Sequence, residues 1–138
     1  MTALAAPPQP PRARHALRCL IVDDDTDFAD SLAELLRHRG HDVRTAGSGL
    51  GAVAAYTDRP ADVVFLDLGL PGLTGHDLAR WVRGLDGREG GRRPRLIAVT
   101  GSNGEADRRA AAEAGIDVFV VKPLDPARLD DLLAGAAR

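Results

Sequence analysis

The sequence has little of what secreted, membrane-bound or nucleic-acid-binding proteins need. Its one cysteine, Cys19, cannot form a disulfide within the chain and is expected to be a small core residue. No apolar run approaches the roughly 20 residues of a membrane-spanning helix, and the N-terminal segment lacks the apolar stretch of a secretory signal. The net charge is −2 at pH 7, without the basic excess of a domain built to hold nucleic acid. These absences predict a cytoplasmic protein with no membrane or direct nucleic-acid partner.

Lysine is the scarcest of the charged residues. Among 18 lysines and arginines, Lys122 is the only lysine. The arginine guanidinium is planar and always charged, whereas the lysine ammonium is a compact point charge on a flexible stem. A single lysine in a chain that otherwise uses arginine indicates a site that needs the smaller cation.

The length and composition predict one globular domain. The chain has 138 residues, of which 44% are apolar and 28% are charged, and this is enough for a substantial core. We expect residues 1–16, which include a Pro-rich stretch, to form a disordered tail. Residues 17–138 are expected to form the domain.

Short apolar runs alternate with helical patterns along this domain. In the first helix Phe28, Leu32, Leu35 and Leu36 recur at the spacing of one helical face. Nearly continuous apolar strands joined by helices predict a parallel sheet covered on both faces. We therefore predict an α/β fold with a doubly wound five-stranded parallel sheet and strand order 2-1-3-4-5. The expected strands cover residues 17–22, 42–46, 62–67, 95–100 and 117–121, and the helices after the first cover 48–59, 74–83, 105–115 and 125–137.

Acidic, hydroxyl and ammonium side chains follow or end four of the predicted strands. In open parallel sheets the carboxyl ends of the strands meet at one edge, where sites form. Strand order 2-1-3-4-5 makes the first and third strands neighbours, so their acids converge. The residues at these ends are Asp23, Asp24 and Asp25 after the first strand, Asp67 in the third, Thr100 in the fourth and Lys122 after the fifth.

Three converging carboxylates cannot all stay ionised without a proton or a cation among them. Oxygen ligands with no histidine or cysteine nearby favour a hard ion, and Mg²⁺ fits better than a caged Ca²⁺. A carboxylate can then act as a nucleophile toward phosphorus while Mg²⁺ and Lys122 neutralise the phosphoryl oxygens. Thr100 is placed to donate a hydrogen bond to one of those oxygens. The sequence therefore predicts a place that receives a phosphoryl group.

Four sequence blocks resemble the receiver domain of two-component response regulators. They are LIVDDD (20–25), DVVFLDLGLPGLTG (62–75), LIAVTG (96–101) and VVKP (120–123), in the family's order and spacing. The resemblance implies a flavodoxin-like (βα)5 fold with Asp67 as the phosphoacceptor. It also implies several roles around that residue: Mg²⁺ ligands Asp23, Asp24, Asp67 and the backbone carbonyl of Gly69, a phosphate-contacting Lys122 with a cis bond to Pro123, a switch hydroxyl on Thr100, and Phe119 as the switch aromatic.

The same resemblance implies a function and its partners. We expect a single-domain receiver that accepts a phosphoryl group from a phosphohistidine of a histidine kinase or histidine phosphotransfer protein. The initiating methionine and the leader favour a complete protein over a piece of a hybrid kinase. The chain would catalyse its own phosphorylation and dephosphorylation only, so it is not expected to be an enzyme in the usual sense. The signal would pass to an unidentified protein partner, with a phosphorylation-dependent dimer as a further option.

Two other functions stay open. One is a Mg²⁺-dependent phosphatase of the haloacid dehalogenase type, which also uses an aspartate nucleophile but needs a second acid two residues later, where Gly69 stands. The other is an interaction module that keeps the receiver fold without phosphorylation. The small residues Gly69 and Ser102 flank the predicted site and leave the lifetime of the phosphoryl group undetermined.

Two local patterns resemble ligand-binding motifs but are expected to form helix caps. Gly47, Gly49 and Ala52 match a dinucleotide-binding motif, but the preceding strand DVRTA is polar and expected near a sheet edge, so we expect Ser48 to cap a helix there. The run DDDTD is also expected to cap the first helix, through Asp25, Thr26 or Asp27.

Overall fold

The computed structural model of the chain describes residues 16–85, 93–101 and 104–136. The predicted tail, apart from its last residue, lies outside these ranges, as do Ser102 and most of the loop that precedes the fourth strand. None of the helices in the described ranges is long and apolar enough to cross a membrane.

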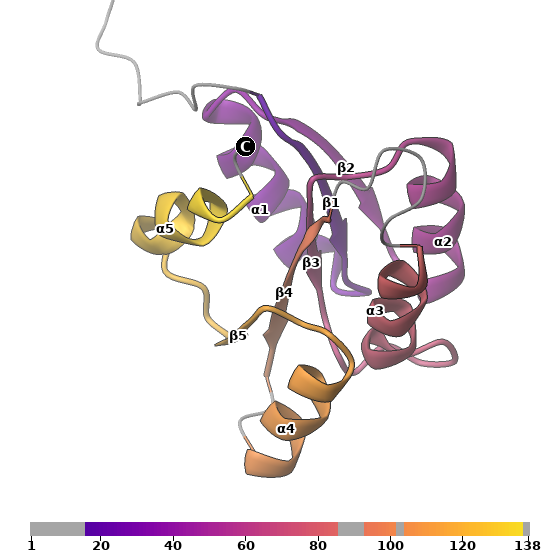
Figure 1. Cartoon of the computed structure of the whole chain (residues 1–138). Helices are drawn as coiled ribbons and strands as arrows, with labels where there is room; N and C mark the ends of the chain where they lie inside the picture. Colours follow the sequence, from indigo (N-terminus) through magenta and orange to yellow (C-terminus); the bar gives the residue numbers. More distant parts are fainter. Residues whose placement is uncertain (1–15, 86–92, 102–103, 137–138) are drawn as a thin grey trace, which may run out of the picture.

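Five parallel strands form one sheet in the order β2-β1-β3-β4-β5, so the predicted fold class and strand order are confirmed (Figure 1). The polar strand β2 lies at an edge, as its composition predicted. Along the described chain the elements are β1 (Arg18–Val22), α1 (Thr26–His38), β2 (Asp42–Ala46), α2 (Gly49–Asp58), β3 (Val63–Leu66), α3 (Gly75–Gly84), β4 (Arg95–Thr100), α4 (Glu105–Glu113), β5 (Val118–Val121), η1 (Pro126–Arg128) and α5 (Leu129–Ala134).

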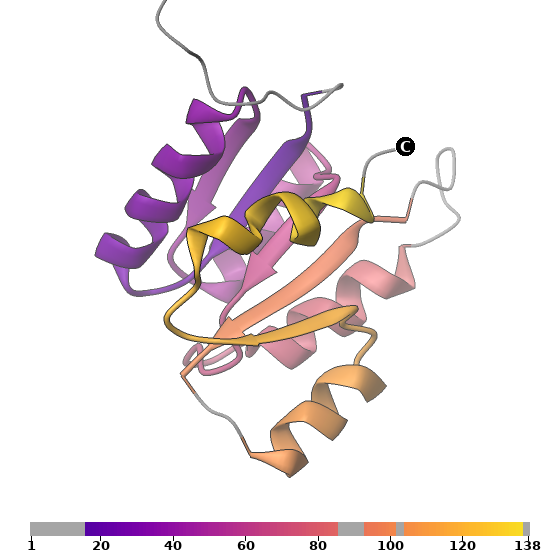
Figure 2. The same cartoon turned by 90° about the vertical axis from the view of Figure 1, so that its left-hand side faces the viewer.

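Helices cover both faces of the sheet, with α1 and α5 on the side that faces the viewer in Figure 2. Because successive strand residues point to opposite faces, the sheet separates two apolar layers. On one face Ile21, Phe65 and Ile97 pack with residues of α1 and α5. On the other face Leu20, Leu66 and Ala98 pack with residues of α2, α3 and α4. Within α4 itself Ala111 is the buried residue, so this alanine-rich helix is held by a small apolar contact.

The strands β1, β3 and β5 begin one residue later than predicted, and an acidic residue directly precedes β3 and β5. Asp62 accepts a hydrogen bond from the backbone N–H of Arg18 on β1 (2.8 Å), and Asp117 accepts one from the backbone N–H of Leu96 on β4 (2.8 Å). Each carboxylate therefore pairs a backbone donor of the neighbouring strand at the start of the sheet.

The last predicted helix, 125–137, is wrong in extent. The chain instead forms a short 3-10 turn, Pro126–Arg128, and then α5, Leu129–Ala134. Asp125 accepts a hydrogen bond from the N–H of Ala127 (2.9 Å), which tightens the first turn. The two predicted caps are confirmed: Asp25 accepts from the N–H of Phe28, and Ser48 accepts from the N–H of Gly51.

Cys19 is a core residue, as predicted. Its side chain is buried on β1, and burial raises the pKa of the thiol to about 12, with a smaller contribution from the charge of Asp62. A thiol that stays protonated at neutral pH is a poor nucleophile. Cys19 therefore contributes packing and no chemistry.

An arginine that sequence analysis did not single out holds the opposite end of the sheet from the predicted site. Arg83, near the end of α3, donates to the carbonyls of Gly115 and Pro94 (2.8 Å each) and to the Asp117 carboxylate (2.7 Å). Arg93 donates to the other oxygen of Asp117 (3.0 Å). Asp117 thus joins α3, β4 and β5 at the start of the strands.

Replacing Asp117 with asparagine is expected to lower the free energy of unfolding by about 2 kcal/mol at pH 7. Burial alone raises the pKa of this carboxyl, but the Leu96 N–H and the two arginines outweigh it and hold the pKa below its ordinary 3.8. The ionised group therefore stabilises the fold above about pH 3.8, and this contribution is lost as the pH falls through the lower folded-state value. Urea unfolding of both proteins at pH 7 and near pH 3 checks this, since a gap that does not shrink in acid contradicts the pairing.

Candidate functional site

The acids predicted to converge do so at the carboxyl end of the sheet. Asp23 directly follows β1 and Asp67 directly follows β3, and the register pairs the last residues of these strands, Val22 with Leu66. Asp23, Asp24 and Asp67 each offer a carboxylate oxygen, and these oxygens lie within 4.8 Å of one another. Asp23 is buried, Asp67 half-buried and Asp24 exposed. The three groups therefore form one acidic cluster that is open to solvent on one side.

Lys122 reaches this cluster from the end of β5. Its Nζ atom lies 2.9 Å from Asp23 Oδ2 and 3.8 Å from Asp67 Oδ2. Burial alone lowers the pKa of the ammonium, but the hydrogen bond to Asp23 and the charges of Asp23 and Asp67 outweigh burial and raise the pKa above its ordinary value. The peptide bond to Pro123 is cis, as predicted. Lys122 is therefore a permanent cation between two acids.

The two oxygens of Asp23 are held from different directions. The backbone N–H of Asp25 donates to Oδ1 (2.9 Å), while Lys122 occupies Oδ2. Asp25 in turn caps α1 by accepting from the N–H of Phe28 (3.2 Å). The start of α1 and the buried acid are thus parts of one hydrogen-bonded turn.

Asp67 is oriented by the turn that follows it. The N–H of Gly69 donates to Asp67 Oδ1 (3.1 Å), which leaves Oδ2 on the side of Lys122. Further along, Gly75 begins α3 against the backbone of Asp67 and Leu68, so closely that a Cβ atom there would lie 2.5 Å from the Asp67 carbonyl oxygen. The role of the Gly69 carbonyl as a metal ligand stays a prediction.

Thr100 and Phe119 lie on the face of the sheet that α4 covers. Thr100 is buried at the end of β4, and the register pairs Ala98 with Phe119 and Thr100 with Val121. The half-buried Phe119 ring is covered by Arg108 of α4, whose Cζ atom lies 4.6 Å from the ring centroid. Their roles as switch residues stay predictions, and the Arg108 contact gives a physical link between Phe119 and α4.

Phe28 contacts the site although its spacing assigned it to the helix core. Its ring is half-buried against the layer of α1 and α5, and Lys122 Nζ lies 4.5 Å from the ring centroid. Periodicity alone could not reveal this contact, because it depends on where Lys122 enters from β5.

The donor set fits a hard divalent cation. Within the described residues it consists of three carboxylates and no nitrogen or sulfur ligand, and the buried member, Asp23, is paired with Lys122. Mg²⁺ prefers oxygen ligands and keeps several waters, which suits a cluster with an exposed side.

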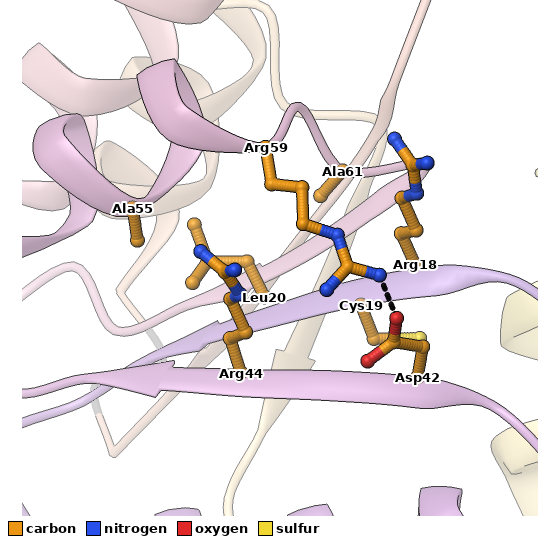
Figure 3. A pocket seen from close by; sticks show the side chains of 8 residues that line it. All are labelled: Arg18, Cys19, Leu20, Asp42, Arg44, Ala55, Arg59 and Ala61. Atoms are coloured by element: carbon orange, nitrogen blue, oxygen red, sulfur yellow. Dashed lines mark hydrogen bonds and ion pairs between the residues drawn. The ribbon is translucent and has the colours of Figure 1, made fainter.

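A small pocket at the other end of β1 and β2 does not compete as a ligand site (Figure 3). It encloses about 10 Å³, room for about one water molecule. Arg59 forms an ion pair with Asp42 across it, and Arg44 pairs with Asp58 (2.9 Å). Its charges are therefore largely used within the protein.

Comparison with known proteins agrees with this geometry. The family described as the response regulator receiver domain matches residues 19–134. The sensory transduction protein RegX3 of Mycolicibacterium smegmatis is 38% identical over 104 residues, which are 75% of this chain and 43% of that protein. The chain spans about half the length of the curated relatives it matches.

Two solved structures are similar over most of the chain. A CheY-like receiver domain protein from Methanospirillum hungatei has a TM-score of 0.78 and 28% identity, over 88% of this chain and 93% of that one. The receiver domain of Ssk1 from Saccharomyces cerevisiae, solved in complex with the histidine phosphotransfer protein Ypd1, has a TM-score of 0.77 and 25% identity, over 86% and 87% of the two chains.

Proposed function

We propose that this chain, which belongs to the response regulator receiver family, accepts a phosphoryl group on Asp67. The observation that carries the proposal is the position of Lys122, whose ammonium lies between the buried Asp23 and the half-buried Asp67. A cation held there neutralises negative charge on the phosphoryl oxygens that arrive next to Asp67. Without Lys122, only water would stabilise that charge from this side.

The proposed step moves one phosphoryl group from nitrogen to oxygen. A carboxylate oxygen of Asp67 attacks phosphorus of a phosphohistidine, the new O–P bond forms as the P–N bond breaks, and the imidazole leaves with the electron pair and takes up a proton. Asp67 Oδ2 faces Lys122, and Oδ1 is engaged by the Gly69 N–H, so Oδ2 is the oxygen we assign as nucleophile. Lys122 then pairs with a phosphoryl oxygen, and Thr100 donates its hydroxyl to another.

Asp23, Asp24, Asp67 and the Gly69 carbonyl are the groups we assign to hold Mg²⁺, which when bound supplies charge neutralisation for the phosphoryl oxygens. Because Asp23 is fixed at both oxygens and buried, it anchors this ligand set. The exposed Asp24 can approach the ion directly.

We assign a histidine kinase or a histidine phosphotransfer protein as the phosphoryl donor. The yeast receiver domain that resembles this chain was solved with a partner of the second kind. We further propose that the chain acts in the cytoplasm and that its output passes to a partner protein or through a phosphorylation-dependent dimer. Charge added at Asp67 would bias Thr100, Phe119 and the lightly held α4 between two arrangements.

The residue two positions after Asp67 favours the acceptance of one phosphoryl group per chain over the catalytic hydrolysis of many phosphoesters. A phosphatase of the haloacid dehalogenase type needs an acid there, whereas Gly69 has no side chain and its backbone N–H is already bonded to Asp67. We therefore propose a carrier that is phosphorylated once per cycle, and not an enzyme that consumes many phosphoesters.

Incubation with acetyl phosphate and Mg²⁺ followed by intact-mass measurement tests the proposal. We expect one phosphoryl adduct per chain, lost when a chelator removes Mg²⁺ and lost in Asp67→Asn. Continued hydrolysis of phosphoesters without an adduct would indicate a phosphatase instead. An unmodified wild-type chain would leave an interaction module with the receiver fold and would contradict the assignment of Asp67.

A further inference from the structure

We propose that Phe28 is a positioning residue for Lys122, holding the ammonium at the acidic cluster on the face of its ring. This rests on the proposed function, in which Lys122 meets the incoming phosphoryl group. Lys122 Nζ lies 4.5 Å from the ring centroid, within the roughly 6 Å over which an aromatic face attracts a cation. The ring is thus the third contact of the ammonium, beside Asp23 and Asp67.

The ring itself is held in place by its neighbours. Phe28 lies in the first turn of α1, and its backbone N–H donates to the capping carboxylate of Asp25 (3.2 Å). Its side chain packs on the apolar layer formed by α1, α5 and the adjoining face of the sheet. Because the helix cap and the core packing fix the ring, contacts within the chain are enough to keep one face of the ring toward Lys122.

Four residues from two distant segments therefore form a closed circuit of contacts. Asp25 N–H donates to Asp23 Oδ1 (2.9 Å), Phe28 N–H donates to Asp25, the Phe28 ring faces Lys122, and Lys122 donates to Asp23 Oδ2 (2.9 Å). Because the circuit closes on the buried acid, a displacement of Phe28 moves Lys122 relative to Asp23.

An aromatic face suits this position better than another carboxylate would. A further acid would add negative charge where phosphoryl oxygens must arrive, and it would bind the ammonium in one direction. A ring attracts the cation without a fixed hydrogen-bond direction. Lys122 can therefore move from Asp23 toward Asp67, now 3.8 Å away, while it stays on the ring.

The single lysine of the chain makes the contact directly measurable. Labelling with isotopic lysine gives one set of side-chain NMR signals, those of Lys122. We expect the protons nearest Nζ to be shifted upfield by the Phe28 ring current, with the shift lost in Phe28→Leu and retained in Phe28→Tyr. Signals without this shift in the wild-type chain would overturn the proposal.

The rate of phosphoryl acceptance from acetyl phosphate tests the role itself. We expect Phe28→Leu, which keeps an apolar side chain, to slow acceptance about 3- to 30-fold, and Phe28→Tyr to stay within about 2-fold of wild type. Leu35→Ala is the matched control, because Leu35 packs on the same apolar layer from the same helix. It is expected to lose stability but to keep the wild-type rate.

The outcomes separate this proposal from the function on which it rests. If the wild-type chain takes no phosphoryl group, the proposed function is wrong and the positioning role falls with it. If the wild-type chain is phosphorylated and Phe28→Leu matches its rate, only the positioning role is wrong. A rate loss in Leu35→Ala equal to that in Phe28→Leu would likewise overturn it, since general packing would then explain both.

Discussion

Replacing Lys122 with methionine is expected to slow phosphoryl acceptance by roughly 100- to 1,000-fold while the chain stays folded. Methionine has a similar length and no charge, so the oxygens of the transferring group lose the cation that now lies between Asp23 and Asp67. The initial rate of adduct formation with acetyl phosphate and saturating Mg²⁺, followed by intact mass, measures the effect.

Arg18→Met is the matched control for this substitution. It removes one positive charge from an exposed residue at the start of β1, at the far end of the strand from the acidic cluster. We expect it to leave the rate unchanged. An equal loss in both variants would mean that net charge, and not the placed ammonium, promotes the reaction.

The Lys122→Met substitution should also tighten Mg²⁺ binding in the absence of a phosphoryl donor. Lys122 now satisfies one oxygen of Asp23, and its removal leaves three carboxylates without their competing cation. Calorimetric titration of the wild-type and Lys122→Met chains compares the affinities directly. Weaker binding in the variant would show that Lys122 supports the ligand geometry instead of competing for it.

Gly75→Ala is expected to lower the free energy of unfolding by about 3 kcal/mol. The new Cβ atom would lie 2.5 Å from the carbonyl oxygen of Asp67 and 2.9 Å from the Cα of Leu68. Both are backbone atoms, so relief requires α3 or the end of β3 to move. Because that segment carries the proposed acceptor, the rate of phosphoryl acceptance should fall together with the stability measured by urea unfolding.

The other end of the same helix provides the control. A Cβ atom at Gly84 meets nothing within 4 Å, and alanine is the better helix former. Gly84→Ala should therefore leave the stability equal or raise it by up to about 1 kcal/mol. If Gly75→Ala were as stable as Gly84→Ala, the close approach of α3 to β3 would not exist in solution.

Sequence patterns revealed the sheet and the acidic cluster because both depend on local signals. Continuous apolar runs such as VVFL of β3 are typical of parallel strands buried on both faces. The carboxyl ends of such strands lie at one edge of the sheet. Asp23, Asp67 and Lys122 were therefore predictable as neighbours. Their separations were not, because these depend on side-chain rotamers that no pattern encodes.

Two features that the sequence did not reveal, the contacts of Arg83 and of Phe28, depend on residues far apart in the chain. Arg83 resembles any exposed helix arginine until its three partners on the start of β4 and β5 are seen. Phe28 carries the same periodic signal as Leu32, yet only Phe28 meets a cation. The short α5 was overestimated because leucines at helical spacing do not reveal where Asp125 and Pro126 tighten the chain.

The site draws on both apolar layers, and this has a consequence for how the domain can change. Lys122 is buttressed from the α1 and α5 side by Phe28, whereas Thr100 and Phe119 belong to the side covered by α4. Under the proposed function, substitutions in the first layer should therefore alter the rate at which Asp67 accepts a phosphoryl group. Substitutions in the second layer should alter how α4 responds to that group. Because the two layers lie on opposite faces of one sheet, a substitution in one layer can change the rate of phosphorylation without changing the response of α4, or the reverse.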